Sequence, residues 1–376
     1  MASVINTNVS SLNTQRNLAT SQSALATSIQ RLSTGLRVNS AKDDAAGLAI
    51  SERMNAQIKG LNVAARNAND GISLAQTAEG ALGKVGDMLQ RMRELAVQSA
   101  NATNSLDDRT ALDAEVQQLS AEIGRVASTT KFNGQAILDG TFTNTTFQVG
   151  ANNGETISVA SIANVQTNAL GVSTRASVNS SAISGFATTA IASGDITING
   201  TNIGAIGAAA NAQDRANQLA TAINTVSATT GVTAVIDTTS NTITLNSSAN
   251  ITIAGAAPAP FTAATTNAAA TTGISSVDVL SAASASTALD TIDSALNTIN
   301  GARGTLGALQ SRFENAISNI QIAAENTSAA RSRIMDTDFA AETAALSRAQ
   351  ILQQAGNAML TQANQLPQQV LALLRN

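Results

Sequence analysis

The chain contains 376 residues, enough for two or three domains, with a formal net charge of −4 and with neither histidine nor cysteine. The missing residue types exclude disulfides, imidazole or thiolate metal ligands and histidine-dependent nucleophilic catalysis. Because the basic residues are not clustered and no apolar run approaches the ~20 residues that span a bilayer, we expect no nucleic-acid partner and no membrane insertion.

The N-terminal residues, up to about position 43, repeat apolar side chains every seven positions, as helices do that pack along one face. The predicted subunit-packing residues of this region are Ile5, Leu12, Leu18, Leu25, Ile29 and Leu32. The segment from Met1 to Ser11 holds no Lys or Arg, so it lacks the basic region of a cleavable signal peptide. We therefore expect a protein that stays in the cytoplasm or leaves by a route without cleavage.

A longer apolar series follows and predicts a long helix with a seam for a partner helix. The predicted bundle-core residues on it are Met54, Ile58, Leu61, Leu82 and Leu89. A shorter helix is expected from Ser105, because Ser105 and Asp108 have the spacing of a capping box.

Residues 131–159 are predicted to form turns and short strands. The pairs Asn133-Gly134 and Asn153-Gly154 are turn signals, and the segments 147–150 and 156–159 are strand-like. The region 173–275 is poor in charge and rich in Thr, Ala, Asn and Gly, and its patterns predict a small α+β module. Its predicted elements are strands at 195–199, 232–236, 242–245 and 251–253, and a helix at 214–226.

The C-terminal part carries a matching seven-residue series. Its predicted bundle-core residues are Ile292, Ile299, Leu306, Phe313 and Ile320. Thr287 and Asp290 are expected to cap this helix at its start. Two matched series at opposite ends of the chain favour an antiparallel intrachain bundle over separate ordinary helices.

The last residues continue the apolar pattern. The predicted subunit-packing residues here are Leu352, Met359, Leu366, Val370 and Leu373. Pro367 lies within the stripe, so the helix should kink or break there. Each terminal region has a wide apolar face, and we expect both to become ordered only when neighbouring molecules bury them. A simple two-helix hairpin that closes the domain is the alternative.

Close carboxylates occur at Asp43-Asp44, Asp107-Asp108 and in the segment 336–338. They lie at predicted helix starts, where negative charge meets the helix dipole favourably, so a structural role is favoured over metal binding or acid–base catalysis. The glycines form no phosphate-binding pattern. We therefore predict no enzymatic activity, no catalytic or metal site and no cofactor.

Several long motifs resemble those of bacterial flagellins, in the same order. The stretches are MASVINTNVSSLNTQRNL at the start, RLSTGLRVNSAKDDAAGLAISERM at 31–54, QRMRELAVQSAN at 90–101, FQVGANNGETISV at 147–159 and NAMLTQANQLPQQVLALLR at 357–375. The similarity is strong over about 1–170 and 276–376 and weak between these ranges.

The resemblance implies a mainly α fold: a long antiparallel coiled-coil bundle formed by both termini, a β-hairpin after the N-terminal helices and a small α+β outer domain. The implied domains are an inner coiled coil of residues 1–43 and 335–376, a helical bundle of 44–172 and 276–334, and a variable outer domain of 173–275.

The resemblance also implies self-assembly into the extracellular flagellar filament for motility, after type III export. The implied partners are further copies of the chain, a flagellar export chaperone, the filament cap protein and the hook–filament junction proteins.

A further implication concerns the host. Flagellins that are detected by the host Toll-like flagellin receptor carry an Arg, a Leu and a Glu at positions that match Arg91, Leu95 and Glu115. The resemblance implies that the monomer is recognised through these residues; without it, Arg91 and Glu115 would be read as solvated helix charges. Similarly, Leu371, Leu373 and Leu374 resemble the segment recognised by cytosolic flagellin sensors.

Two alternative functions stay open. A hook–filament junction protein shares flagellin-like ends, but the complete motifs throughout 31–159 argue against it. A secreted coiled-coil effector is the second, and its pore-forming version would need an apolar membrane-inserting hairpin that the sequence lacks.

Overall fold

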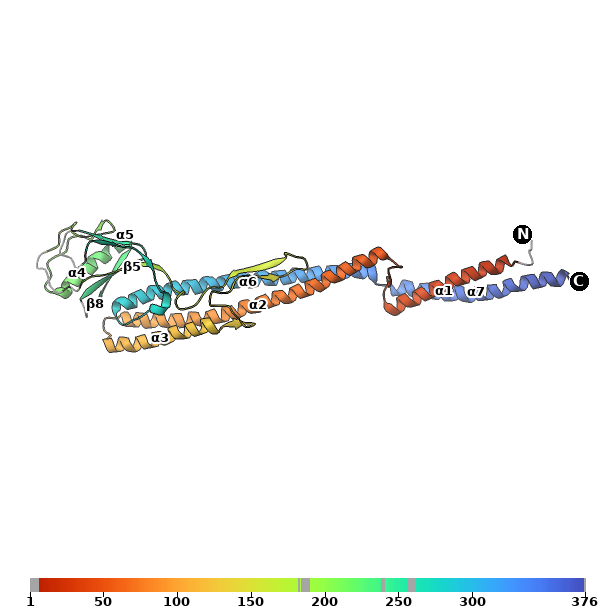
Figure 1. The fold of residues 1–376 in the computed structure, drawn as a ribbon, viewed down its shortest axis with the longest axis horizontal. Helices are drawn as coiled ribbons and strands as arrows, with labels where there is room; N and C mark the ends of the chain where they lie inside the picture. The colour runs from red at the N-terminus through yellow and green to blue at the C-terminus, as the bar shows by residue number, and fades with distance from the viewer. Residues whose placement is uncertain (1–6, 182, 184–189, 238–240, 256–260, 375–376) are drawn as a thin grey trace. The chain divides into compact units, whose positions relative to one another are not determined.

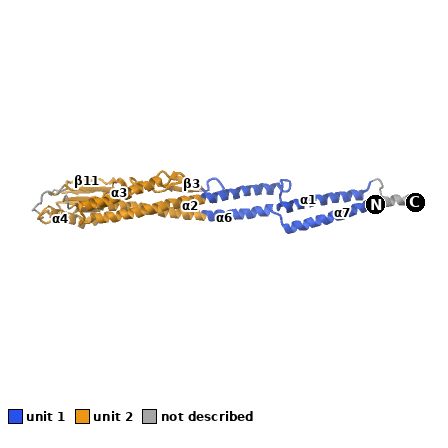
Figure 2. Cartoon of the chain, turned by 90° about the horizontal axis from the view of Figure 1, so that it is seen from below, with its two compact units in different colours: residues 1–67, 148–155, 316–376 blue, residues 68–147, 156–315 orange. Residues whose placement is uncertain are grey.

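In the computed structural model the described residues are 7–181, 183, 190–237, 241–255 and 261–374, with side chains described up to residue 365. The chain divides into two compact units (Figure 2). The first comprises residues 1–67, 148–155 and 316–376, and the second comprises residues 68–147 and 156–315. Two long helices contribute to both units.

The two ends of the chain form a helix pair within the first unit. Helices α1 (Val9–Thr34) and α7 (Phe339–Leu374) lie side by side (Figure 1) and contact each other along their lengths. Asn8 caps α1, since its side chain accepts a hydrogen bond from the Ser11 amide. The helix ends at Gly35, whose φ of 71° is the left-handed conformation that glycine adopts easily at a helix end.

The long helices α2 (Ala45–Ala100) and α6 (Ala282–Met335) run antiparallel. In the second unit Gln310 donates to Glu79, and Arg93 pairs with Asp293 at 2.7 Å, so residue numbers rise along α2 as they fall along α6. This confirms the predicted antiparallel bundle. The third helix, α3 (Leu106–Thr129), begins with the predicted reciprocal capping box of Ser105 and Asp108.

The predicted start of α6 is wrong. The helix begins at Ala282, and Thr287 lies inside it and donates to the Ala283 carbonyl. Its first turn is closed instead by Ser281 and Ser284, each of which accepts the other's backbone N–H. Serine side chains cap the helix start in the way that a Thr–Asp pair would. The small residues 282–286 extend the helix toward its N-terminus, beyond the apolar series that begins at Ile292.

The expected break at Pro367 does not occur, because α7 continues through this residue to Leu374. Proline lacks the N–H that would bond to the carbonyl four residues earlier, that of Ala363. The side chain of Asn8 donates to this carbonyl at 2.8 Å, so the acceptor keeps a partner.

Short strands follow α3. Strands β1 (Lys131–Phe132) and β2 (Gln135–Ala136) pair antiparallel around Asn133-Gly134, where both residues have positive φ. Strands β3 (Thr143–Gln148) and β4 (Thr156–Ser161) form a second two-stranded sheet, near the predicted strand positions.

The central module contains two four-stranded sheets and helix α4 (Ala212–Thr225). The sheet orders are β11-β10-β6-β7 and β12-β5-β9-β8, and the neighbouring strands pair antiparallel. The strands are β5 (Thr174–Asn179), β6 (Thr197–Ile198), β7 (Thr201–Asn202), β8 (Val232–Asp237), β9 (Thr242–Ser247), β10 (Ile251–Ala254), β11 (Ala264–Thr266) and β12 (Ala269–Ala270). The short helix α5 (Ser227–Thr230) follows α4, and the 3-10 helix η1 (Gly273–Ser276) follows β12.

This module has its own hydrophobic core. The buried side chains of that core come from residues 176–261, among them Leu219 and Ile223 of α4 and Ile243 and Leu245 of β9. The fold is therefore mainly helical with a small α+β insert, as predicted.

Candidate subunit-packing surface and bundle core

Helices α1 and α7 expose large apolar side chains although they pack on each other. Leu12 and Ile29 of α1 are each 52% exposed, and Leu352 and Met359 of α7 are 51% and 63% exposed. The residues that α1 buries are the small polar Ser11 and Ser28. The helix pair therefore leaves most of its large apolar side chains in contact with water.

The remaining predicted subunit-packing residues divide into two groups. Leu18, Leu25 and Leu32 are half-buried. Gly356 of α7 lies against Leu18, since a Cβ at Gly356 would come within 3.2 Å of Leu18 Cδ1. Ile5 and the side chains of Leu366, Val370 and Leu373 lie outside the described residues.

Polar contacts join α1 to α7 at both ends of α1. The Ser11 hydroxyl donates to Asn364 Oδ1 at 2.8 Å, and Arg31 lies 3.8 Å from the carboxylate of Glu342. These residues were not predicted from the sequence, since isolated polar side chains add no periodic signal. The capping preference of asparagine before an apolar helix was the available clue to Asn8.

The segment that joins α1 to α2 and the segment that joins α6 to α7 contact each other within the first unit. Leu36 and Asp336 form an antiparallel bridge, and the Arg37 amide donates to the Met335 carbonyl. The Arg37 guanidinium donates from Nε and Nη2 to the Ile334 carbonyl, at 3.2 and 2.7 Å. A charged donor thus satisfies an end carbonyl of α6.

The close carboxylates cap backbone amides. Asp44 accepts from the Gly47 amide and Asp338 accepts from the Ala340 amide. The Ser40 and Asn39 amides and the Ser40 hydroxyl hold the pKa of Asp43 below its ordinary value. These contacts agree with the structural role expected for these residues.

The centre of the bundle is closed by Phe313. Its ring is fully buried, lies against Gly71 of α2 and meets Phe147 edge-on, with centroids 5.5 Å apart and an interplanar angle of 84°. The other buried residues of the predicted bundle core are Leu61, Leu82, Leu89, Ile292, Ile299, Leu306 and Ile320. Met54 and Ile58 are half-buried.

The three residues matched to receptor recognition occupy different environments. Arg91 of α2 pairs with Glu115 of α3 at 2.8 Å and with Glu94 at 3.0 Å, and the three side chains are largely exposed. The hydrogen bond with Glu115, followed by that with Glu94, raises the pKa of Arg91. Leu95, by contrast, is only 1% exposed and lies in the bundle interior.

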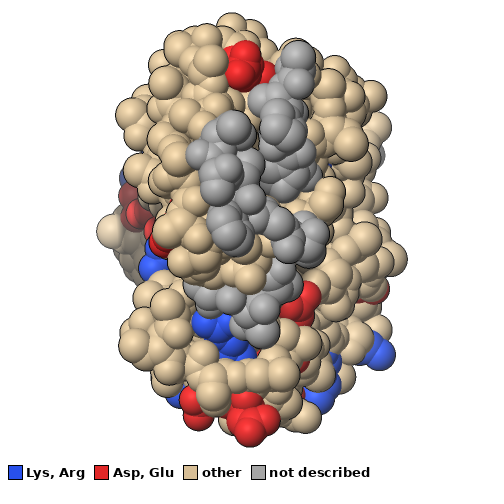
Figure 3. Space-filling model, turned by 90° about the vertical axis from the view of Figure 1, so that its left-hand side faces the viewer, with Lys and Arg blue, Asp and Glu red and all other residues tan. Residues whose placement is uncertain are grey.

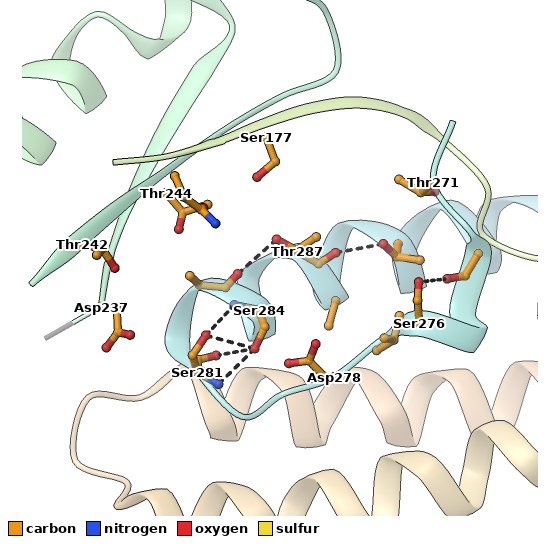
Figure 4. Close-up of a pocket in the computed structure, with 16 residues that line it drawn as sticks. Ser177, Asp237, Thr242, Thr244, Thr271, Ser276, Asp278, Ser281, Ser284 and Thr287 are labelled. Atoms are coloured by element: carbon orange, nitrogen blue, oxygen red, sulfur yellow. Dashed lines mark hydrogen bonds between the residues drawn. The ribbon is translucent and has the colours of Figure 1, made fainter. Parts of the chain in front are cut away.

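A cavity of about 420 Å³ lies beside the first turns of α6 (Figure 4). Hydroxyl groups of Ser177, Thr242 and Thr244 face it from the central module, and Asp237 and Asp278 add carboxylates. The Ser281 and Ser284 hydroxyls on the opposite side bond to each other and to the helix start. The Ser281–Ser284 contacts therefore cap the start of α6.

Within the described part of the chain, charged side chains do not gather at the end of the molecule that faces the viewer in Figure 3. On the face shown in Figure 3, the charged side chains of the described residues are scattered among uncharged ones. The described helices include none with the length and apolarity that a membrane span requires. In the same part of the chain, no three carboxylates gather as a metal site would need.

The chain is similar to known flagellins over its whole length. The family model of the bacterial flagellin N-terminal helical region matches residues 5–143, that of the C-terminal helical region matches 289–374, and the flagellin hook IN motif matches 195–249. Flagellin D of Vibrio anguillarum and flagellin C of Vibrio cholerae are each 42% identical, and B-type flagellin of Pseudomonas aeruginosa is 40% identical. Each of these alignments covers all of both chains.

Solved structures show partial likeness. FliC from Burkholderia pseudomallei is 26% identical with a TM-score of 0.39, over 64% of this chain and 99% of that one. Flagellar hook associated protein-3 from Legionella pneumophila is 16% identical with a TM-score of 0.45, over 75% and 98%. The full-length identity and the family models together show that the chain belongs to the bacterial flagellins, the non-enzymatic structural subunits of the extracellular filament that serves motility.

Proposed function

We propose that the exposed apolar side chains of α1 and α7 are the surface through which subunits pack in the filament, and that both helices become ordered as they are buried. This proposal is supported above all by the exposure of four large apolar side chains. Each of them is more than half exposed: Leu12, Ile29, Leu352 and Met359. Full burial from full exposure contributes about 1.5–3 kcal/mol for such a side chain, so burial of its remaining exposed half contributes roughly 0.8–1.5 kcal/mol. Several of them together offset an association cost of about 4–15 kcal/mol.

We also propose that three domains of the chain have different roles in the filament. Residues 1–43 and 335–376 form the inner coiled coil, residues 44–172 and 276–334 form the supporting bundle, and residues 173–275 project outward. The separate hydrophobic core of residues 176–261 supports the last assignment, because all of its buried side chains come from the outer module.

Replacement of Leu352 and Met359 by serine tests the packing surface. We expect the critical concentration for seeded polymerisation to rise more than tenfold, while the thermal unfolding of the bundle is unchanged, because both side chains are already exposed in the single chain. The matched control is Gln354→Ser, an exposed position on the same helix that removes no apolar side chain. If the double variant polymerises like the unaltered chain, these two side chains are not part of the subunit-packing surface.

We further propose that the host Toll-like flagellin receptor recognises the monomer around Arg91 and Glu115. The support is their exposed ion pair, which joins α2 to α3. Leu95 lies four residues after Arg91 in α2 and is buried, so its contribution is to the packing of the bundle that holds the pair.

Receptor activation by the purified monomer tests this site. Arg91→Ala should lower activation at least tenfold, because both a cation and its two carboxylate contacts are lost. The matched control is Arg125→Ala, which removes the arginine of an exposed pair with Glu122 on α3. Equal activity of the two variants would exclude Arg91 from recognition. Leu95→Ala is a poorer probe, because it would leave a cavity in the bundle.

We also propose an export chaperone, the filament cap protein and the hook–filament junction proteins as partners, with the chaperone covering α7 before assembly. The exposed Leu352 and Met359 support this role. A chain shortened to residues 1–352 should no longer bind the chaperone in a pull-down, and retained binding would contradict the assignment.

A further inference from the structure

Pro367 creates a defect in α7 at a defined atom. Its ring nitrogen carries no hydrogen, so the Ala363 carbonyl loses its partner within the helix. Ala363 is only 7% exposed, so water replaces that partner poorly. A buried carbonyl without a partner weakens a folding or association equilibrium about five- to 150-fold.

Asn8 supplies the missing hydrogen bond from the opposite end of the chain. Its Nδ2 donates to the Ala363 carbonyl at 2.8 Å, while its Oδ1 accepts from the Ser11 amide at 3.0 Å. The Ser11 side chain, itself 6% exposed, continues the contact by donating to Asn364 at 2.8 Å. The side-chain amide of Asn8 therefore caps α1 and also supplies the hydrogen bond that α7 lacks at the Ala363 carbonyl.

We infer that Asn8 is the register-determining residue of the α1–α7 pair, and that Pro367 is what makes it necessary. The apolar heptads do not define a unique alignment, because Leu18, Leu25 and Leu32 are related by shifts of seven residues. The freed carbonyl occurs at one position only. A slip of seven residues keeps the apolar face but moves the carbonyl by about 10 Å along the axis, out of reach of Asn8.

This inference rests on the proposed packing role of the two helices, since a slipped pair would misplace Leu12 relative to Met359. The experiment uses seeded polymerisation of the full-length chain. Polymerisation of the unaltered chain tests the packing role, and the variants below test the register.

Two substitutions remove the donor and keep the cap. Asn8→Asp retains an acceptor for the Ser11 amide, and aspartate is as good an N-cap as asparagine. Asn8→Ser also caps, brings no charge and is too short to reach Ala363. In the background with Pro367, both should raise the critical concentration about tenfold.

Pro367→Ala provides the decisive background, because alanine restores the N–H that bonds to the Ala363 carbonyl. There the same Asn8 substitutions should raise the critical concentration less than threefold. Equal losses in both backgrounds, or no loss in either, would overturn the inference. If the Asn8 variants do not polymerise at all with Pro367, recovery by Pro367→Ala supports it and failure to recover contradicts it.

Disulfide trapping in filaments reports the register directly, since the chain has no other cysteine. The pair Ser11→Cys with Asn364→Cys should cross-link, and the pair Ser11→Cys with Asn357→Cys, displaced by one heptad, should not. Added Asn8→Ser should shift cross-linking toward the displaced pair. Unchanged cross-linking preference would mean that the register is set elsewhere.

Discussion

Single polar side chains end and begin the helices of this chain. Asp108 is one of them: its carboxylate accepts from the Ser105 hydroxyl at 2.7 Å and from the Ser105 amide at 3.0 Å, while the Asp108 amide donates back to the hydroxyl. The Ser105 hydroxyl, followed by its amide, lowers the pKa of Asp108 below the ordinary 3.8. The charged form is therefore favoured by folding.

This cap should make part of the stability depend on pH. A carboxyl whose pKa is lower in the folded state contributes stability that is complete above its unfolded pKa and is lost as the pH falls through its folded pKa. We expect Asp108→Asn to be less stable than the unaltered chain at neutral pH, and the difference to shrink as the pH falls below the ordinary value of 3.8 and to vanish only below the lowered pKa of the folded state.

Urea unfolding between pH 7 and pH 2 measures this difference. Asp107→Asn is the matched control, because it removes one negative charge from the same first turn. A gap between the Asp108 variant and the unaltered chain that persists at the lowest pH would contradict the prediction.

Between elements, close approach of α2 and α6 depends on a missing side chain. A Cβ at Gly71 would lie 2.6–2.9 Å from three ring atoms of Phe313, whose ring is fully buried and also packs on Phe147. The apolar heptads bring the helices together, and Gly71 allows them to close around the largest side chain of the seam.

Gly71→Ala should lower the free energy of unfolding by about 1–3 kcal/mol through overpacking. Gly80→Ala in the same helix has no atom within 4 Å of its Cβ and should raise stability by up to about 1 kcal/mol through helix propensity. Chemical denaturation followed by circular dichroism measures both. If both alanines stabilise the chain, the close packing of Phe313 is not as described.

At the scale of the whole chain, the outer module enters and leaves the bundle at one point. The Thr271 amide donates to the Ser173 carbonyl at 2.8 Å, and the Ser173 amide donates to the Thr271 hydroxyl at 3.0 Å. The module has its own core, and Arg175 of β5 also joins it to α6, through an ion pair with Asp290 at 2.8 Å and a hydrogen bond to the Thr287 carbonyl.

Replacement of residues 175–270 by a short Gly/Ser linker should therefore preserve filament formation. The two ends that the linker joins already lie within hydrogen-bonding distance. Electron microscopy after seeded polymerisation would show filaments, and the critical concentration should stay within about threefold. Asp290→Ala in the intact chain controls for loss of the Arg175 pair. Absence of filaments would give the module a structural role in assembly.

The order of helices, the antiparallel bundle and most of its buried residues follow from the seven-residue periodicity. Leu82, Leu89, Ile299 and Phe313 were expected to face the seam from their spacing, and all four are buried. Long periodic patterns are informative because many residues report the same face. The capping box at Ser105 was likewise readable, since its chemistry is local.

Other features required the tertiary structure. The Ser281–Ser284 start of α6 lies outside the apolar series, so periodicity could not locate it. Burial of Leu95 depends on how three helices meet, while its neighbour Arg91 stays exposed. A linear pattern gives a helical face but not which neighbours cover it.

By itself the sequence determined the periodic faces, the local caps and the family, because these depend on spacing and on long motifs. Only the tertiary structure decided how Pro367 is accommodated, since the donor that satisfies the Ala363 carbonyl comes from Asn8, 355 positions away. Hydrogen bonds between distant residues leave no periodic signal, and their partners are identified only when the chain has folded.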